Sequence, residues 1–110
     1  MALELQITAT FTAEPLRPSL DFWFNQLGTP VEIRFSEYSQ VLQQALNPLS
    51  ESSRNESGFN LFLIRPEDIA GSKSPAVTVD EIADAIIGLA ERSRATQLVV
   101  FCPHQERTEE

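Results

Sequence analysis

The chain has 110 residues and a mass of 12.3 kDa, with 16 acidic and 8 basic side chains and a net charge of -8. This length predicts one domain, and Cys102, the one cysteine, excludes an internal disulfide framework and a multi-cysteine zinc site. The acidic balance, without a Lys/Arg cluster, argues against nucleic-acid binding. No apolar run approaches the ~20 residues of a membrane span. We therefore expect a cytoplasmic protein without metal or cofactor.

The first third of the chain predicts a strand, a helix and a second strand. Apolar residues alternate over residues 3–10, and over 31–35 they alternate with charged residues. Between these strands, apolar residues recur at helical spacing up to Gly28, which favours a helix end, and Pro15 or Pro18 suits the first helical position. The stripe consists of Leu16, Leu20, Trp23, Phe24 and Leu27, and we expect Trp23 and Phe24 in the core.

The rest of the chain predicts two further helices and two further strands. We expect a helix over 36–46, a surface loop over 50–58 and a second loop over 65–76. Thr78 and Glu81 have the spacing of a capping box, which places the start of the third helix at Thr78. Residues 59–64 and 98–102 are near-continuous apolar runs, typical of strands buried on both faces of a parallel sheet. An ordered core is expected over 5–103, with a flexible polar tail over 104–110.

These elements alternate as βαβαβαβ, which predicts a three-layer α/β domain with a mostly parallel four-stranded sheet and helices on both faces. We expect the strand order 2-1-3-4, because the 31–35 strand carries a charged face that suits an edge. The apolar 98–102 strand then lies at the opposite edge, where backbone groups stay unpaired. We therefore expect a cover for it: a second copy, a neighbouring domain, or further structure of a larger multidomain protein.

Candidate binding residues gather at the carboxyl ends of the strands, where open parallel sheets bind ligands. They are Thr10 and Thr12 after the first strand, Ser36, Glu37 and Tyr38 after the second, Arg65, Glu67 and Asp68 after the third, and His104 after the fourth. Structural roles explain several of them: a helix cap for Thr12, an acidic partner for Arg65, and a turn or short helix for Glu67 and Asp68. We assign no catalytic residue.

Two side chains of the apolar strands need separate explanations. Asn60 is an amide within an apolar run, so it must find partners when buried, either in a neighbouring loop or in a site. Cys102 is expected to be a buried, inert thiol. The sequence has no Gly-rich phosphate loop, no metal-ligand spacing and no Gly-x-Ser-x-Gly elbow. The binding candidates are therefore Thr10, Thr12, Tyr38, Asn60 and Arg65.

Several segments resemble the N-terminal domain of FkbH-like proteins: ITATFTAEPL (7–16), LDFW (20–23), YSQVLQQ (38–44), NPLS (47–50) and GFNLFLIRPEDI (58–69). Related domains occur in polyketide synthase and nonribosomal peptide synthetase assembly lines of natural product biosynthesis. The resemblance runs from about Leu5 to His104. It implies a degenerate SGNH-hydrolase-like fold, which in FkbH-like proteins precedes a phosphatase-like domain that loads glyceryl units onto a carrier protein.

The sequence departs from this family where the family's chemistry resides. The phosphatase-like domain is absent, so glyceryl transfer is not carried over. Thr10-Phe11-Thr12 stands where the SGNH pattern has its nucleophilic serine, and Asn60 matches the asparagine of that pattern only loosely. The catalytic histidine of the pattern belongs to a later segment, so His104 does not take its role.

Three functions follow as hypotheses. The first is a non-catalytic domain of an assembly-line protein that contacts a neighbouring domain. The second is a degenerate SGNH-like hydrolase or acyltransferase that uses Thr10 or Thr12 as its nucleophile. The third is a small homodimeric binding protein in which the last strands of two copies pair.

Overall fold

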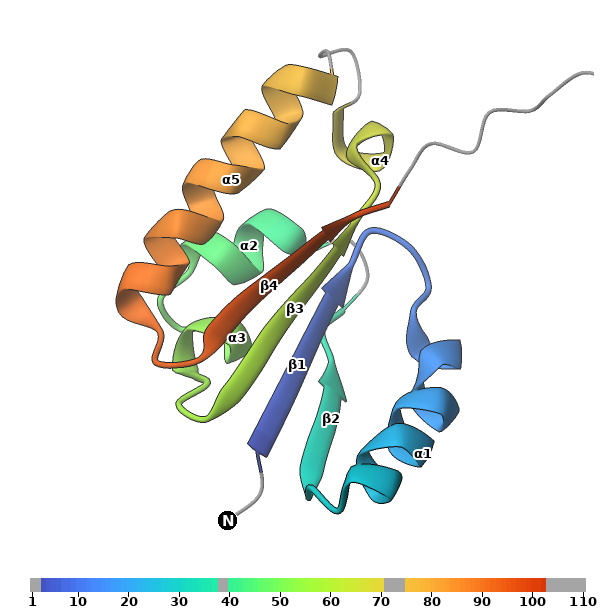
Figure 1. Cartoon of the computed structure of the whole chain (residues 1–110). Helices are drawn as coiled ribbons and strands as arrows, with labels where there is room; N and C mark the ends of the chain where they lie inside the picture. The colour runs from blue at the N-terminus through green and yellow to red at the C-terminus, as the bar shows by residue number, and fades with distance from the viewer. Residues whose placement is uncertain (1–2, 38–39, 71–74, 103–110) are drawn as a thin grey trace, which may run out of the picture.

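The structure, a computed structural model, describes residues 3–37, 40–70 and 75–102, and its centre is a four-stranded parallel sheet (Figure 1). The strands are β1 (Leu3–Ala9), β2 (Val31–Phe35), β3 (Gly58–Ile64) and β4 (Thr96–Phe101), in the order β2-β1-β3-β4. Helices lie on both sides of the sheet, so the expected α/β architecture and strand order are confirmed. The predicted tail over 104–110 lies outside the described residues.

One face of the sheet packs against α1 (Arg17–Leu27), which follows the short 3-10 helix η1 (Glu14–Leu16). Leu20 and Phe24 of α1 pack on a buried cluster formed by Leu5, Ile7, Ala9, Ala13, Ile33 and Leu63. Arg17 holds the start of α1 against β2, because its guanidinium donates to the Ile33 carbonyl at 3.0 Å. Gly28 ends the helix in the left-handed conformation, with a φ of 68°.

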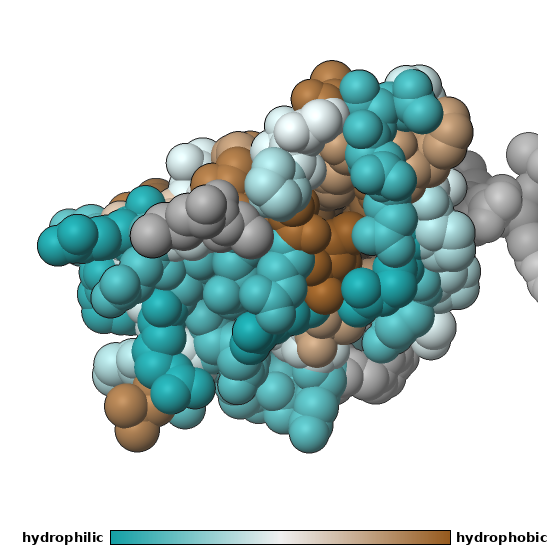
Figure 2. All heavy atoms as spheres, turned by 90° about the horizontal axis from the view of Figure 1, so that it is seen from below, coloured by the Kyte–Doolittle hydropathy of each residue, from teal (hydrophilic) through white to brown (hydrophobic). Residues whose placement is uncertain are grey.

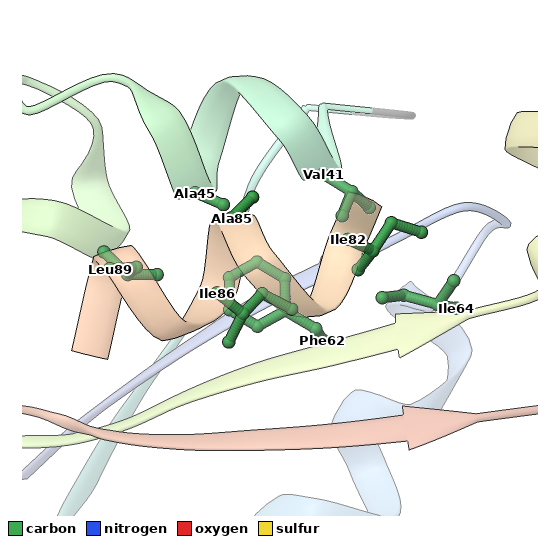
Figure 3. Packing of buried hydrophobic residues seen from close by; sticks show 8 residues of the cluster. All are labelled: Val41, Ala45, Phe62, Ile64, Ile82, Ala85, Ile86 and Leu89. Atoms are coloured by element: carbon green, nitrogen blue, oxygen red, sulfur yellow. The ribbon is translucent and has the colours of Figure 1, made fainter. Parts of the chain in front are cut away.

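The opposite face carries α2 (Val41–Leu46), α3 (Glu51–Arg54), α4 (Pro66–Ala70) and α5 (Pro75–Arg92), with α5 spanning the length of the strands (Figure 1). Figure 3 shows side chains of α2, α5 and β3 pointing toward one another in this layer. The buried cluster comprises Val41, Ala45, Phe62, Ile64, Ile82, Ala85, Ile86 and Leu89. The domain therefore has two apolar layers, one on each face of the sheet.

Several local predictions were wrong. The predicted loop over 50–58 contains α3, which begins with the Ser50 hydroxyl accepting a hydrogen bond from Ser53 N at 3.0 Å. The helix that was predicted to start at Thr78 is α5, and it begins at Pro75. Thr78 therefore lies inside α5 and does not cap it. Trp23 is 61% exposed, whereas Phe24 packs on the core as expected, because α1 turns only one narrow face to the sheet.

Hydrophobic side chains also reach the molecular surface. Seen from below, they form a band with hydrophilic residues on both sides of it (Figure 2). Within the described residues, no helix is long and apolar enough to cross a membrane.

Gly58 is required where β3 begins beside β1. Its φ is 102°, and an added Cβ would lie 2.8 Å from Glu4 N and closer still to the Glu4 carbonyl oxygen. We expect Gly58→Ala to lower the free energy of unfolding by about 2 kcal/mol or more, since a positive φ and a backbone clash add together. Urea denaturation measures this loss.

Gly88→Ala is the matched control. Gly88 lies inside α5, where the nearest atom to an added Cβ is a side-chain nitrogen of Arg92 at 3.7 Å. We expect a gain of about 0.5–1 kcal/mol, because alanine restricts the unfolded chain and favours helix. Equal effects of the two substitutions would contradict this account of Gly58.

Candidate functional site

Thr10 follows β1 and ties its carboxyl end to the segment after β3. The side chain is 1% exposed, and its Oγ1 donates to Asp68 Oδ2 at 2.9 Å while accepting from the backbone N–H of Arg65 at 3.0 Å. The backbone N–H of Thr10 donates to the Leu63 carbonyl at 3.1 Å. The hydroxyl is thus buried and has both a donor and an acceptor role, which suits a structural link better than a nucleophile.

Arg65 lies beside Thr10, as expected, and it pairs with an acidic side chain. Its Nε donates to Asp68 Oδ2 at 2.8 Å, and its guanidinium lies 5.0 Å from the centre of the Phe11 ring. One oxygen of Asp68 therefore accepts from both Thr10 and Arg65. The sequence pattern predicts Asp68 in this region but does not identify it as the centre of the cluster, because its partners lie 58 residues and 3 residues away.

Thr12 is exposed and lines a hollow of about 370 Å³ at the carboxyl ends of β1 and β2. The other residues around it are Ile7, Ala9, Phe11, Ala13, Glu14, Phe35 and Ser36. The prediction that Thr12 caps a helix was wrong: Ala13 and Leu16 are the N-cap residues of η1 and α1, and neither makes a side-chain capping bond. Thr12 is thus accessible to a ligand, in a hollow lined mostly by apolar side chains.

Asn60 is not at the carboxyl end of the sheet, so its place in the predicted site was wrong. It is the third residue of β3 and is fully buried. Its Nδ2 donates to the Ser52 carbonyl at 2.8 Å and to Gln97 Oε1 at 3.1 Å, and its Oδ1 accepts from Asn55 Nδ2 at 3.0 Å. The amide thus joins β3, β4 and the α3 region, which is the structural role that the sequence left open as an alternative.

Asn60 belongs to a polar row that crosses all four strands. In the parallel register, Arg34 of β2 pairs with Gln6 of β1, Gln6 with Asn60, and Asn60 with Gln97 of β4. Paired residues of a parallel sheet point to the same face, here the face covered by α2, α3 and α5. The exposed Arg34 forms an ion pair with Glu32 at 2.7 Å, and this carboxylate raises the pKa of its guanidinium.

The remaining candidates are less informative. Tyr38 and His104 lie outside the described residues. Cys102 is a free cysteine of intermediate exposure, so it is less buried than predicted. Its backbone N–H donates to the Ile64 carbonyl at 2.7 Å. Across residues 3–37, 40–70 and 75–102, no group of three His, Cys, Asp or Glu side chains could hold a metal ion.

The most exposed apolar surface on the sheet lies at β4. Leu98, Val99, Val100 and Phe101 are 43%, 37%, 46% and 41% exposed, although they belong to a strand of the sheet. On one side β4 pairs with β3, and on the other side no described strand lies beside it. This set of four residues, here called the β4 surface, is the candidate interaction site.

Comparisons with known proteins add nothing to these observations: no protein-family model, no curated protein and no solved structure matches the chain.

The Thr10 cluster predicts a stability effect. Thr10→Val removes the hydroxyl and leaves the Arg65 N–H and one oxygen of Asp68 without this partner, so we expect a loss of about 1–3 kcal/mol in the free energy of unfolding. Thr10→Ser keeps the hydroxyl and loses one methyl group, which costs about 0.8 kcal/mol. Chemical denaturation distinguishes the two; a larger loss in the serine variant would argue against a structural hydroxyl.

Replacing Asn60 should lower the free energy of unfolding more than replacing Gln97, its partner on the edge strand β4. Asn60→Leu leaves the Asn55 amide, the Ser52 carbonyl and Gln97 without this partner inside the domain, and we expect a loss of about 3 kcal/mol or more. Gln97→Ala, the control, removes one partner of Asn60 from a half-buried position, and we expect a loss of about 1 kcal/mol. Thermal and urea unfolding measure both, and similar losses would show that Asn60 is not the centre of the network.

Proposed function

We propose that this chain is a non-catalytic structural and interaction domain of a modular polyketide or nonribosomal peptide assembly line, and that its β4 surface packs against a neighbouring domain. The observation that carries the proposal is the exposure of four consecutive apolar residues on an edge strand. Proteins that leave an edge strand in water place charged residues, proline or a bulge there. The sequence of β4, TQLVVF, has neither a charged residue nor proline.

The resemblance of segments 7–16 and 58–69 to FkbH-like N-terminal domains supports the assembly-line context. The geometry around Thr10 supports a non-catalytic role, because a nucleophile must reach its substrate and this hydroxyl is buried and bonded to Asp68. The net charge of -8 argues against direct docking of an acidic carrier protein, which the domain would repel at long range. A neighbouring catalytic or structural domain is therefore the proposed partner.

The interaction is tested by mixing the chain, labelled with nitrogen-15, with each domain that flanks it in its parent polypeptide. We expect backbone amide shifts concentrated at residues 98–101 with one of these domains. Val99→Lys places a charge in the apolar contact and should weaken binding at least tenfold. Ile87→Lys is the control, because Ile87 is 60% exposed on α5 and lies outside the β4 surface. This variant should bind the flanking domain as tightly as the unmodified chain does.

Three outcomes would contradict the proposal. The absence of shifts with every flanking domain removes the assembly-line interaction. A concentration-dependent dimer of the chain alone, lost in Val99→Lys and kept in Ile87→Lys, supports the homodimer in its place. Release of product from an activated ester that is abolished by Thr12→Ala supports the hydrolase.

A further inference from the structure

The β4 surface is open in two directions, and each direction requires a different kind of cover. The first is the outer edge of the strand. Because Cys102 donates its N–H to the Ile64 carbonyl of β3, the alternation of backbone groups points the N–H and C=O of Val99 and Phe101 away from β3. Such groups are satisfied by another strand that pairs with the edge.

The second open direction is the sheet face on the side of α1. Phe59, Leu61 and Leu63 of β3 belong to the layer that packs against α1, and their partners on β4 are Thr96, Leu98 and Val100. The residues of α1 that reach this layer, Leu20 and Phe24, pack on it together with residues of β1 and β2. Figure 1 shows α1 on the β2 side of the sheet, away from β4.

Exposure along this face increases from β3 to β4. Leu63 is 8% exposed, and its partner Val100 is 46% exposed; Leu61 is half-buried, and its partner Leu98 is 43% exposed. The other face of β4 lies on the side of α5, which contacts the strand, although Val99 and Phe101 on that face are still 37% and 41% exposed. Of the two faces, the α1 side is thus the one over which the described helices place no cover at β4.

A second copy of the chain would cover the edge and leave this face open. Two β4 strands related by a twofold axis would pair antiparallel and place both α1 helices on the same side of an eight-stranded sheet, at its two outer ends. Between them both β4 strands would stay bare on this face, with the half-buried Phe59 and Leu61 of each β3 at the borders, and β3 would lie about 14 Å from its copy at a spacing of about 4.8 Å per strand. An α-helix with its side chains is about 10 Å wide, so there is room for a helix that the described residues of neither copy provide.

Resting on the proposed function, we infer that the partner contributes a strand joined to an amphipathic helix. The strand pairs with Val99 and Phe101 at the edge of β4, and the apolar side of the helix packs on Phe59, Leu61, Leu98 and Val100. A strand of six residues by itself buries less than the roughly 1,200–2,000 Å² typical of stable interfaces, and the helix adds the missing contact area. Since the chain carries a charge of -8, Lys and Arg at the rim of that helix complement it.

Two matched peptide libraries displayed on phage test this inference against the full chain. One library contains randomised six-residue strands, and the other joins the same strands through a short turn to a 14-residue amphipathic helix. We expect selection to enrich helix–strand peptides that bind at least tenfold more tightly than their strand halves, as measured by fluorescence anisotropy. Circular dichroism verifies that each variant of the chain folds, and Val100→Lys replaces Leu98→Lys if the latter does not.

Substitutions separate the two contacts. Leu98→Lys should remove the tenfold advantage of the helix and leave binding of the strand half unchanged, because Leu98 points to the α1 side. Ile87→Lys should change neither value. Equal affinities of strand and helix–strand peptides, no effect of Leu98→Lys, or enrichment only of strands that copy residues 96–101 would overturn the inference.

These results are independent of the assembly-line context, because the peptides come from no natural partner. If a flanking domain shifts residues 98–101 and no helix–strand peptide is enriched, the inference fails and the proposed function stands. If helix–strand peptides bind through Leu98 and no flanking domain does, the surface is as inferred and the proposed function is wrong.

Discussion

The structure depends on the requirement that the strands of a parallel sheet be covered on both faces and be either paired or protected at their edges. β1 and β3 meet this requirement inside the domain, because each has two neighbouring strands and lies between helical layers. β2, at the other edge, is protected by exposed charged residues such as Glu32 and Arg34, which form an ion pair. Among the described residues, β4 has neither a second neighbouring strand nor a charged side chain, so the stability of this strand and the proposed interaction depend on the same four side chains.

The polar groups of the domain are used mainly to hold its own elements together. Thr10, Arg65 and Asp68 join the carboxyl end of β1 to α4, and Asn60 joins β3 to α3 and β4. Buried groups with several mutual partners rigidify a fold, and their cost when unpaired keeps them in place. The hollow beside Thr12 differs from these bonded polar clusters, because its lining is mostly apolar and Thr12 is exposed. A scaffold of this kind agrees with the proposed role as an interaction domain.

The sheet was predictable from the sequence and the polar contacts were not. The alternation of Val31, Ile33 and Phe35 and the continuous apolar run of residues 59–64 determine which strand lies at an edge and which lies inside. α3 was missed because four residues are too few to show a helical period, and Trp23 was misplaced because spacing cannot distinguish the flank of a stripe from its centre. The Thr10–Asp68 contact joins residues 58 positions apart, which no local pattern records.

The row formed by Arg34, Gln6, Asn60 and Gln97 has a consequence for how the chain aligns itself during folding. Leu98–Phe101 contains no polar residue, so hydrophobicity alone does not distinguish one side of this segment from the other. A shift of β4 by one position would turn Gln97 into the layer of Leu61 and bring Leu98 or Thr96 opposite Asn60, so the buried amide would lose one of its partners. The hydrogen bond between these two amides thus favours the alignment in which Leu98 and Val100 face the side of α1.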